Sequence, residues 1–241
     1  MDLSTRPSDP VSESGPRAGD IETALAVGLA AACFARTFRG PRSSFWRRMT
    51  GTGAVLGAVA LAREPSLRSV RPRPRHLVEG GIVAGGLYAI FRAGDAVARR
   101  VMPDGAGDID DIYALRVGHD PSQIAARLAL VIGPAEELFW RGFVQRRLAR
   151  DHGRWGAAAR AASAYAGVHL AAGNPTLVGA AGVAGAYWSV LAAAGVDMES
   201  LVVSHVLWDI VIFLVAPTAR SGTHPVVSSG ALSRRVPPGA R

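Results

Sequence analysis

The chain has 241 residues, enough for one membrane bundle of about six to eight helices or for one or two small soluble domains. Hydrophobic residues make up 49% of the sequence and aromatic residues only 7%, and the mean hydropathy is +0.19. The apolar content is therefore mostly Ala, Val, Leu and the 28 Gly, small residues that allow helices to pack closely in lipid. This composition favours a membrane bundle over soluble domains.

The net charge of +8 is carried by arginine, because the chain contains no lysine. A soluble nucleic-acid-binding protein is one class with such a charge. The arginines, however, cluster between apolar stretches, at 36–48, 63–75 and 146–160. Charges that flank apolar segments are typical of membrane proteins, so we expect a lipid bilayer as partner and no nucleic acid. The single cysteine, Cys33, excludes a disulfide framework within the chain.

Apolar segments follow one another along the chain and predict an all-α, multi-pass transmembrane bundle of about six to eight helices. Residues 1–20 are rich in Ser, Pro, Asp, Glu and Gly, which predicts a disordered tail, and no cleavable signal peptide is recognised there. Apolar runs follow over 21–38, 50–62 and 77–91, each near the lower limit for crossing roughly 30 Å of hydrocarbon. An acidic, turn-rich loop over 103–120 ends this N-terminal membrane part, 21–120.

A second membrane unit is expected over 121–217. Its first helix starts near Pro121, passes through Gly133 and Pro134 and continues beyond Arg147, with charges in its middle. Three further segments are expected over 155–172, 175–196 and 198–217. The segment 175–196 has no charged residue and is the clearest transmembrane helix, because a span needs about twenty apolar residues. Residues 218–241 are again rich in Ser, Pro, Gly and Arg, which predicts a second disordered tail.

Loop charge predicts that the basic stretch 146–160 is cytoplasmic and that the acidic loop is outside. The short second segment, 50–62, conflicts with this rule if it crosses the bilayer, because one of the two arginine clusters beside it must then lie outside. A re-entrant or interfacial segment would remove the conflict. Both alternatives remain open on sequence alone.

Three clusters of ionisable residues interrupt the apolar segments of the second unit, at a cost of roughly a few kcal/mol for each buried charge. They are Glu136, Glu137 and Arg141; Tyr165 and His169; and His205 and Asp209. Each places polar groups one helical turn apart, so Glu137 and Arg141 are expected to pair on one face, while Glu136 points elsewhere and is suited to deprotonating water. Taken alone, each cluster has an ordinary explanation. The first fits an ion pair at a solvated helix end, the second a buried histidine that bonds a backbone carbonyl, and the third a polar contact that holds helices together. Together, the three predict a shared interior site.

The order and spacing of these clusters resemble the CPBP family (CAAX protease and bacteriocin-processing), whose members are membrane endopeptidases and include the eukaryotic Ras-converting enzymes. The family pattern is E-E-x-x-x-R, then F-x-x-x-H, then H-x-x-x-N or D, on successive helices. The resemblance covers about 121–217. Two positions depart from it: Tyr165 stands where Phe is usual, and Asp209 stands where the prenyl-protein enzymes have Asn.

The resemblance implies a role for each cluster. Glu136 would activate water with help from His169. The oxyanion would be held by His205 and Asp209, and Arg141 would orient Glu137. An ionised Asp209 would repel an oxyanion, which puts its role in question.

The resemblance also implies a peptide or protein substrate associated with the membrane, with prenylated CAAX-type C-termini as one class, and a multi-pass location in the cell membrane. Glu, His and Asp are also zinc ligands, so a metalloprotease is an alternative. The strongest local zinc-protease pattern, H-E-x-x-H, is absent from the sequence, and we favour glutamate chemistry without a metal. Two other functions fit the same residues: an inactive immunity or scaffold protein, and a small proton-coupled transporter.

Overall fold

The structure, a computed structural model, describes residues 18–101 and 111–216. Within these ranges the chain forms helices and no strand. The predicted all-α fold is therefore confirmed. The expected N-terminal tail up to residue 17, the part of the expected acidic loop up to residue 110, and the expected C-terminal tail lie outside the described residues.

The helices of the bundle are α1 (Ala18–Phe38), α2 (Phe45–Arg63), α3 (Pro74–Val101), α5 (Pro121–Arg127), α6 (Gly133–Glu137), α7 (Arg146–His169), α8 (Pro175–Ala194) and α9 (Met198–Ile210). Two π-helical turns, Leu128–Ile132 and Leu138–Gln145, join α5, α6 and the beginning of α7 into one continuous rod. Helix α7 is then interrupted by a kink at Gly153, whose backbone is not helical (φ 65°, ψ 165°). A third, Val211–Val215, extends α9. The predicted helix that starts near Pro121 and continues past Arg147 is thus present as α5, α6 and the beginning of α7.

Local capping explains where two of these helices begin. The side chain of Asp120 accepts hydrogen bonds from the hydroxyl and the backbone N–H of Ser122, both at 2.8 Å, and these bonds hold the pKa of the carboxyl below its usual value. Asn174 likewise accepts from the backbone N–H of Leu177 at 2.8 Å. A proline follows each cap, at a position where its missing N–H costs nothing.

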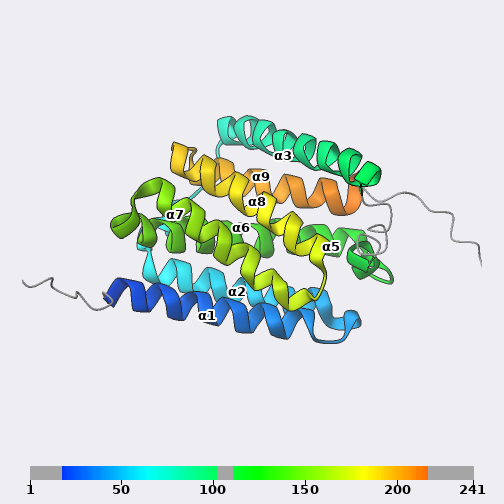
Figure 1. The fold of residues 1–241 in the computed structure, drawn as a ribbon, viewed down its shortest axis with the longest axis horizontal. Coiled ribbons are helices and arrows are strands. Elements are labelled where there is room, and N and C mark those ends of the chain that lie inside the picture. The colour runs from blue at the N-terminus through cyan, green and yellow to red at the C-terminus, as the bar shows by residue number, and fades with distance from the viewer. Residues whose placement is uncertain (1–17, 102–110, 217–241) are drawn as a thin grey trace, which may run out of the picture.

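The helices pack in three layers (Figure 1). The hairpin of α1 and α2 lies along one side of the bundle, and α3 lies along the opposite side against α9. Between them, α6 contacts both α2 and α9, while α7 packs against α1 and α8. The short helix α6, which carries Glu136 and Glu137, therefore lies at the centre of the molecule.

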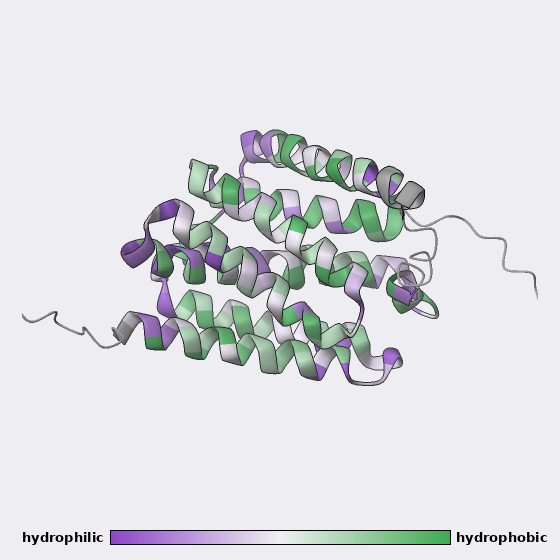
Figure 2. Cartoon of the chain, in the orientation of Figure 1, coloured by the Kyte–Doolittle hydropathy of each residue, from purple (hydrophilic) through white to green (hydrophobic). Residues whose placement is uncertain are grey.

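Four helices are long and apolar enough to cross a membrane, among the residues that the structure describes: Gly19–Phe38, Pro74–Ala96, Pro175–Ala194 and Met198–Val215. They include the segment that the sequence marks as the clearest span. Figure 2 shows apolar residues along the lengths of the helices and hydrophilic residues gathered at the ends of the bundle. These four helices indicate a membrane protein.

The second helix runs antiparallel to α1 over nearly the same length (Figure 1), although it is not among the four candidate spans. The arginine clusters at 36–48 and 63–75 therefore lie at opposite ends of the bundle. At one end, Arg42 pairs with Asp111 at 2.7 Å. At the other, Arg147 of α7 pairs with Glu22 of α1 and with Glu64 beside α2, both at 2.9 Å.

Glycine allows α3 to approach α9 closely. A Cβ atom added at Gly80 would lie 2.6 Å from Cγ1 of Val203 and 2.9 Å from the carbonyl oxygen of Ser200. Its neighbour Gly81 would meet nothing within 4 Å. The two glycines thus differ in packing while sharing one helix.

We predict that Gly80→Ala lowers the free energy of unfolding in detergent by about 1–3 kcal/mol, because the methyl group forces two helices apart. Gly81→Ala is the matched control and is expected to keep or slightly raise the stability, since alanine is the better helix former. Thermal unfolding followed by circular dichroism measures both. Equal melting temperatures for the two variants would contradict the packing described for α3 and α9.

Candidate active site

Two adjacent carboxylates lie at the centre of the bundle, on the short α-helical stretch between two π-helical turns. Glu136 is 3% exposed and Glu137 is fully buried. Each π turn shifts the register of the following residues relative to a regular α-helix, and such turns occur frequently at functional sites. Both carboxylates thus lie in the interior of the bundle, where the sequence predicts them.

The buried Glu137 carboxylate joins two helices. The Arg141 guanidinium donates from Nη1 to Oε1 of Glu137 at 3.0 Å, which is the predicted i, i+4 pair. Nδ1 of His205, on α9, lies 2.7 Å from the same oxygen. Because an ionised carboxylate only accepts hydrogen bonds, Nδ1 of His205 is the donor, and Glu137 orients the histidine ring.

Helix α8 contacts both partners of Glu137, Arg141 and His205. Arg141 also donates from Nη2 to the carbonyl oxygen of Gly185 at 3.0 Å. The ring of Trp188 stacks on His205 with centroids 4.1 Å apart and planes 13° apart, and its Nε1 donates to the hydroxyl of Ser204 at 2.9 Å. Arg141 and His205 are therefore fixed by contacts with α8 as well as by Glu137.

A glycine brings the glutamate helix against α9. A Cβ atom at Gly133 would lie 3.0 Å from Cγ2 of Val206 and 3.1 Å from the carbonyl oxygen of Leu128. This is tighter than ordinary van der Waals contact, so the absence of a side chain lets α6 and α9 approach. The approach places Glu137 within hydrogen-bonding distance of His205.

The second carboxylate, Glu136, is bound by Tyr165 of α7. The phenolic hydroxyl of Tyr165 donates to Oε2 of Glu136 at 2.8 Å. One turn later, Nδ1 of His169 lies 2.7 Å from the backbone carbonyl oxygen of Tyr165. Since a carbonyl oxygen only accepts, Nδ1 carries the proton, and Nε2 of a neutral His169 is left with its lone pair.

The remaining predicted pair lies one turn apart on α9. Nε2 of His205 is 3.6 Å from Oδ2 of Asp209, so the two carboxylates Glu137 and Asp209 flank the two nitrogens of one ring. Asp209 is 7% exposed. The imidazole is thus oriented from both sides.

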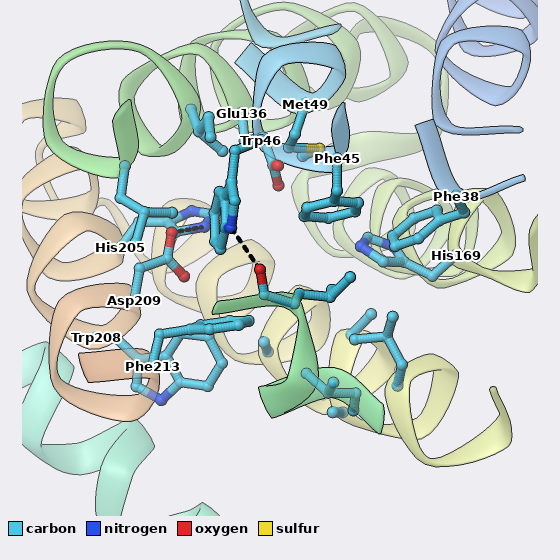
Figure 3. Close-up of a pocket in the computed structure, with 18 of the residues that line it drawn as sticks. Phe38, Phe45, Trp46, Met49, Glu136, His169, His205, Trp208, Asp209 and Phe213 are labelled. Atoms are coloured by element: carbon cyan, nitrogen blue, oxygen red, sulfur yellow. Dashed lines mark hydrogen bonds and ion pairs between the residues drawn. The ribbon is translucent and has the colours of Figure 1, made fainter. Parts of the chain in front are cut away.

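Four of the six predicted site residues line one cavity of about 120 Å³: Glu136, His169, His205 and Asp209. Figure 3 shows His205 and Asp209 together on one side of this space and His169 on the other, beside Phe38. Glu137 and Arg141 lie behind the wall, where Glu137 contacts His205. The three clusters therefore meet from α6, α7 and α9, as the predicted shared interior site requires.

Aromatic residues that the sequence reading did not single out form much of the rest of the wall. They are Phe38, Phe45, Trp46, Trp208 and Phe213. The first three come from α1 and α2, so the N-terminal hairpin completes the cavity. The concentration of aromatic residues around the turn at 39–44 is a local signal, but nothing in the sequence places that turn beside α6.

The described part of the chain holds no group of three or more His, Cys, Asp or Glu side chains arranged to bind a metal ion. Nδ1 of His169 and Nδ1 of His205 are each engaged by a protein oxygen, which leaves one nitrogen of each ring as a possible ligand.

Residues 120–211 match the family described as type II CAAX prenyl endopeptidase Rce1-like. This segment is similar to the Rce1-like family. The resemblance predicted from the three clusters is thereby confirmed. No curated protein and no solved structure matches the chain.

The Rce1-like segment begins one residue before the predicted start of the second membrane unit and contains all three polar clusters. The helices α1, α2 and α3 lie outside it. Because α1 and α2 contribute aromatic walls to the cavity, the site extends beyond the matched residues. The family description favours a protease within a membrane.

We predict that Arg141→Lys destabilises the folded protein by on the order of 3 kcal/mol, the cost of leaving a buried charge poorly paired. A lysine ammonium cannot reproduce the planar fork that reaches both Glu137 and the carbonyl oxygen of Gly185. Thermal unfolding in detergent is the measurement, and Arg146→Lys, at an exposed position, is the control. Equal stability of the two variants would show that Arg141 does not hold the interior together.

Proposed function

We propose that this protein is an intramembrane endopeptidase that hydrolyses a peptide bond with a water molecule activated by Glu136. The observation that carries the proposal is the meeting of Glu136, His169, His205 and Asp209 around one cavity inside the Rce1-like segment. Amide hydrolysis by water needs at least a general base that deprotonates the water and polar groups that stabilise the oxyanion formed from the peptide carbonyl.

In the proposed reaction, water binds between Glu136 and Nε2 of His169. Glu136 accepts a proton as the water oxygen attacks the carbonyl carbon of the scissile peptide. The resulting tetrahedral intermediate breaks at the C–N bond, and the proton held by Glu136 passes to the leaving amine. The water is thus divided between the new carboxyl and amino ends, and the carboxylate is regenerated.

The oxyanion of the intermediate is assigned to the side of the cavity where His205 and Asp209 lie. His205 faces this position with Nε2, the ring nitrogen that Glu137 does not engage. Because Nδ1 already donates to Glu137, Nε2 donates to the oxyanion in the doubly protonated form of the ring, whose positive charge the carboxylates of Glu137 and Asp209 pair. Glu137 and Arg141 act indirectly, because they fix the plane of the His205 ring. A preorganised donor in a site with little water stabilises developing charge far more than the same donor in solution.

We propose peptides that reach the cavity from the membrane as the substrates, with prenylated CAAX-type C-termini as the class that the family description names, and the cell membrane as the location. The aromatic walls from α1, α2 and α9 suit an apolar group beside the scissile bond. For the glutamate chemistry without a metal, the support is that the described residues hold no group of three or more His, Cys, Asp or Glu side chains arranged to bind a metal ion.

We predict that Glu136→Gln abolishes cleavage, because the amide cannot accept a proton from water. The measurement is a proteomic comparison of cells that produce the wild type with cells that produce the variant, searching for peptide ends formed only in the former. Glu199→Gln, on α9 outside the cavity wall, is the matched control and should yield the same ends as the wild type. Identical peptide ends in the wild-type and Glu136→Gln cells, with both proteins present in the membrane, would refute the proposal.

We predict that Asp209→Ala lowers the cleavage rate by about tenfold or more, the order expected for loss of one polar group at the oxyanion. Asp209→Asn should be the more active of the two, because the amide can donate to an oxyanion and accept from His205. Chelators should have little effect on any of these proteins. If Asp209→Asn were inactive and regained activity with added zinc, the metal-free mechanism would be wrong and the protein would be a metalloprotease.

A further inference from the structure

We infer that the hydroxyl of Tyr165 is a positioning group for the catalytic carboxylate: it holds one oxygen of Glu136 so that the other oxygen faces water in the cavity. The inference rests on the proposed function. It concerns a position where this chain departs from the pattern of the family it resembles, since phenylalanine, the usual residue, has no hydroxyl.

The contact between the two side chains is direct and buried. The phenolic oxygen lies 2.8 Å from Oε2 of Glu136, and Tyr165 and Glu136 are only 5% and 3% exposed. A hydroxyl that donates to an ionised carboxylate makes a stronger bond than one between neutral groups. Rotation of the carboxylate away from this position would break that bond.

The ring of Tyr165 is held in place by contacts that do not involve its hydroxyl. Gly185 of α8 leaves room for the ring, because a Cβ atom there would lie 2.9 Å from Cδ1 of Tyr165. The Arg141 guanidinium lies over the ring at 5.0 Å, and Trp140 packs edge-on with centroids 5.5 Å apart. A phenylalanine can therefore occupy the same place and lose only the hydrogen bond.

Tyr165 also contacts the second group of the proposed water site. Its backbone carbonyl oxygen engages Nδ1 of His169 at 2.7 Å, and the two rings pack with centroids 4.8 Å apart. One residue thus fixes the carboxylate of Glu136 through its side chain and the tautomer of His169 through its backbone. Substitution by phenylalanine separates these effects, because it removes the first and leaves the second.

The test uses the full-length protein in phospholipid vesicles and a synthetic peptide that spans a cleavage site found by comparing wild type with Glu136→Gln. Tyr165→Phe should lower kcat by about ten- to a hundredfold, the range for one hydrogen bond to a charged group, with KM within about twofold of the wild type. The matched control is Tyr187→Phe, which removes a hydroxyl that donates to the carbonyl oxygen of Val83 at 2.9 Å, and it should leave both constants unchanged.

Two further variants separate positioning from packing. Replacing Tyr165 by p-methylphenylalanine fills the volume of the hydroxyl without a donor and should show the same loss of kcat as Tyr165→Phe. In a Glu136→Asp background, where the shorter carboxylate no longer meets the hydroxyl, Tyr165→Phe should cause little additional loss, because the two effects act through one contact.

A Tyr165→Phe variant with wild-type kcat would overturn the inference, and so would a full recovery of kcat with p-methylphenylalanine, which would make the effect one of packing. Either result leaves the proposed function standing as long as Glu136→Gln is inactive on the same peptide. Cleavage by Glu136→Gln would instead remove the proposed function itself.

Discussion

The fully buried carboxylate of Glu137 is the group around which the interior of this bundle is organised. One of its oxygens accepts from Arg141 on its own helical rod and from His205 on α9. A charge in this position is tolerated only when it is well paired, since a buried ion left without a partner costs about 3–5 kcal/mol. Pairing these three groups requires the close approach of α6 and α9 that Gly133 allows, and the cavity lies beside this contact.

The residues that face the cavity come from two parts of the chain. The polar groups belong to the Rce1-like segment, whereas Phe38, Phe45 and Trp46 from the N-terminal hairpin complete the wall. Apolar walls around a few ionisable groups lower the local dielectric response, which strengthens every charge–dipole interaction at the reacting bond. The hairpin of α1 and α2 therefore contributes to the proposed chemistry although it carries none of the three polar clusters.

The helices themselves were largely predictable from hydropathy, with errors at their ends. The second and third apolar runs were expected over 50–62 and 77–91, whereas α2 covers Phe45–Arg63 and α3 covers Pro74–Val101. A hydropathy pattern detects only the apolar part of a helix, but the backbone hydrogen bonds continue through polar residues at the bundle ends. The π-helical turns on both sides of Glu136 and Glu137 were not predicted. The first ends directly before Gly133 and Pro134, and proline lacks the N–H that a regular helical hydrogen bond needs.

The sequence by itself determined which residue types lie one turn apart on each helix, and so it predicted the pairing of Glu137 with Arg141 and of His205 with Asp209, and the family that shares this order. Only the tertiary structure decided the partners between helices: His205 on Glu137, and Tyr165 on Glu136. The physical reason is that helical periodicity sets contacts within a helix. Contacts between helices depend on how closely two backbones approach, which here is decided by the space at Gly133 and Gly185.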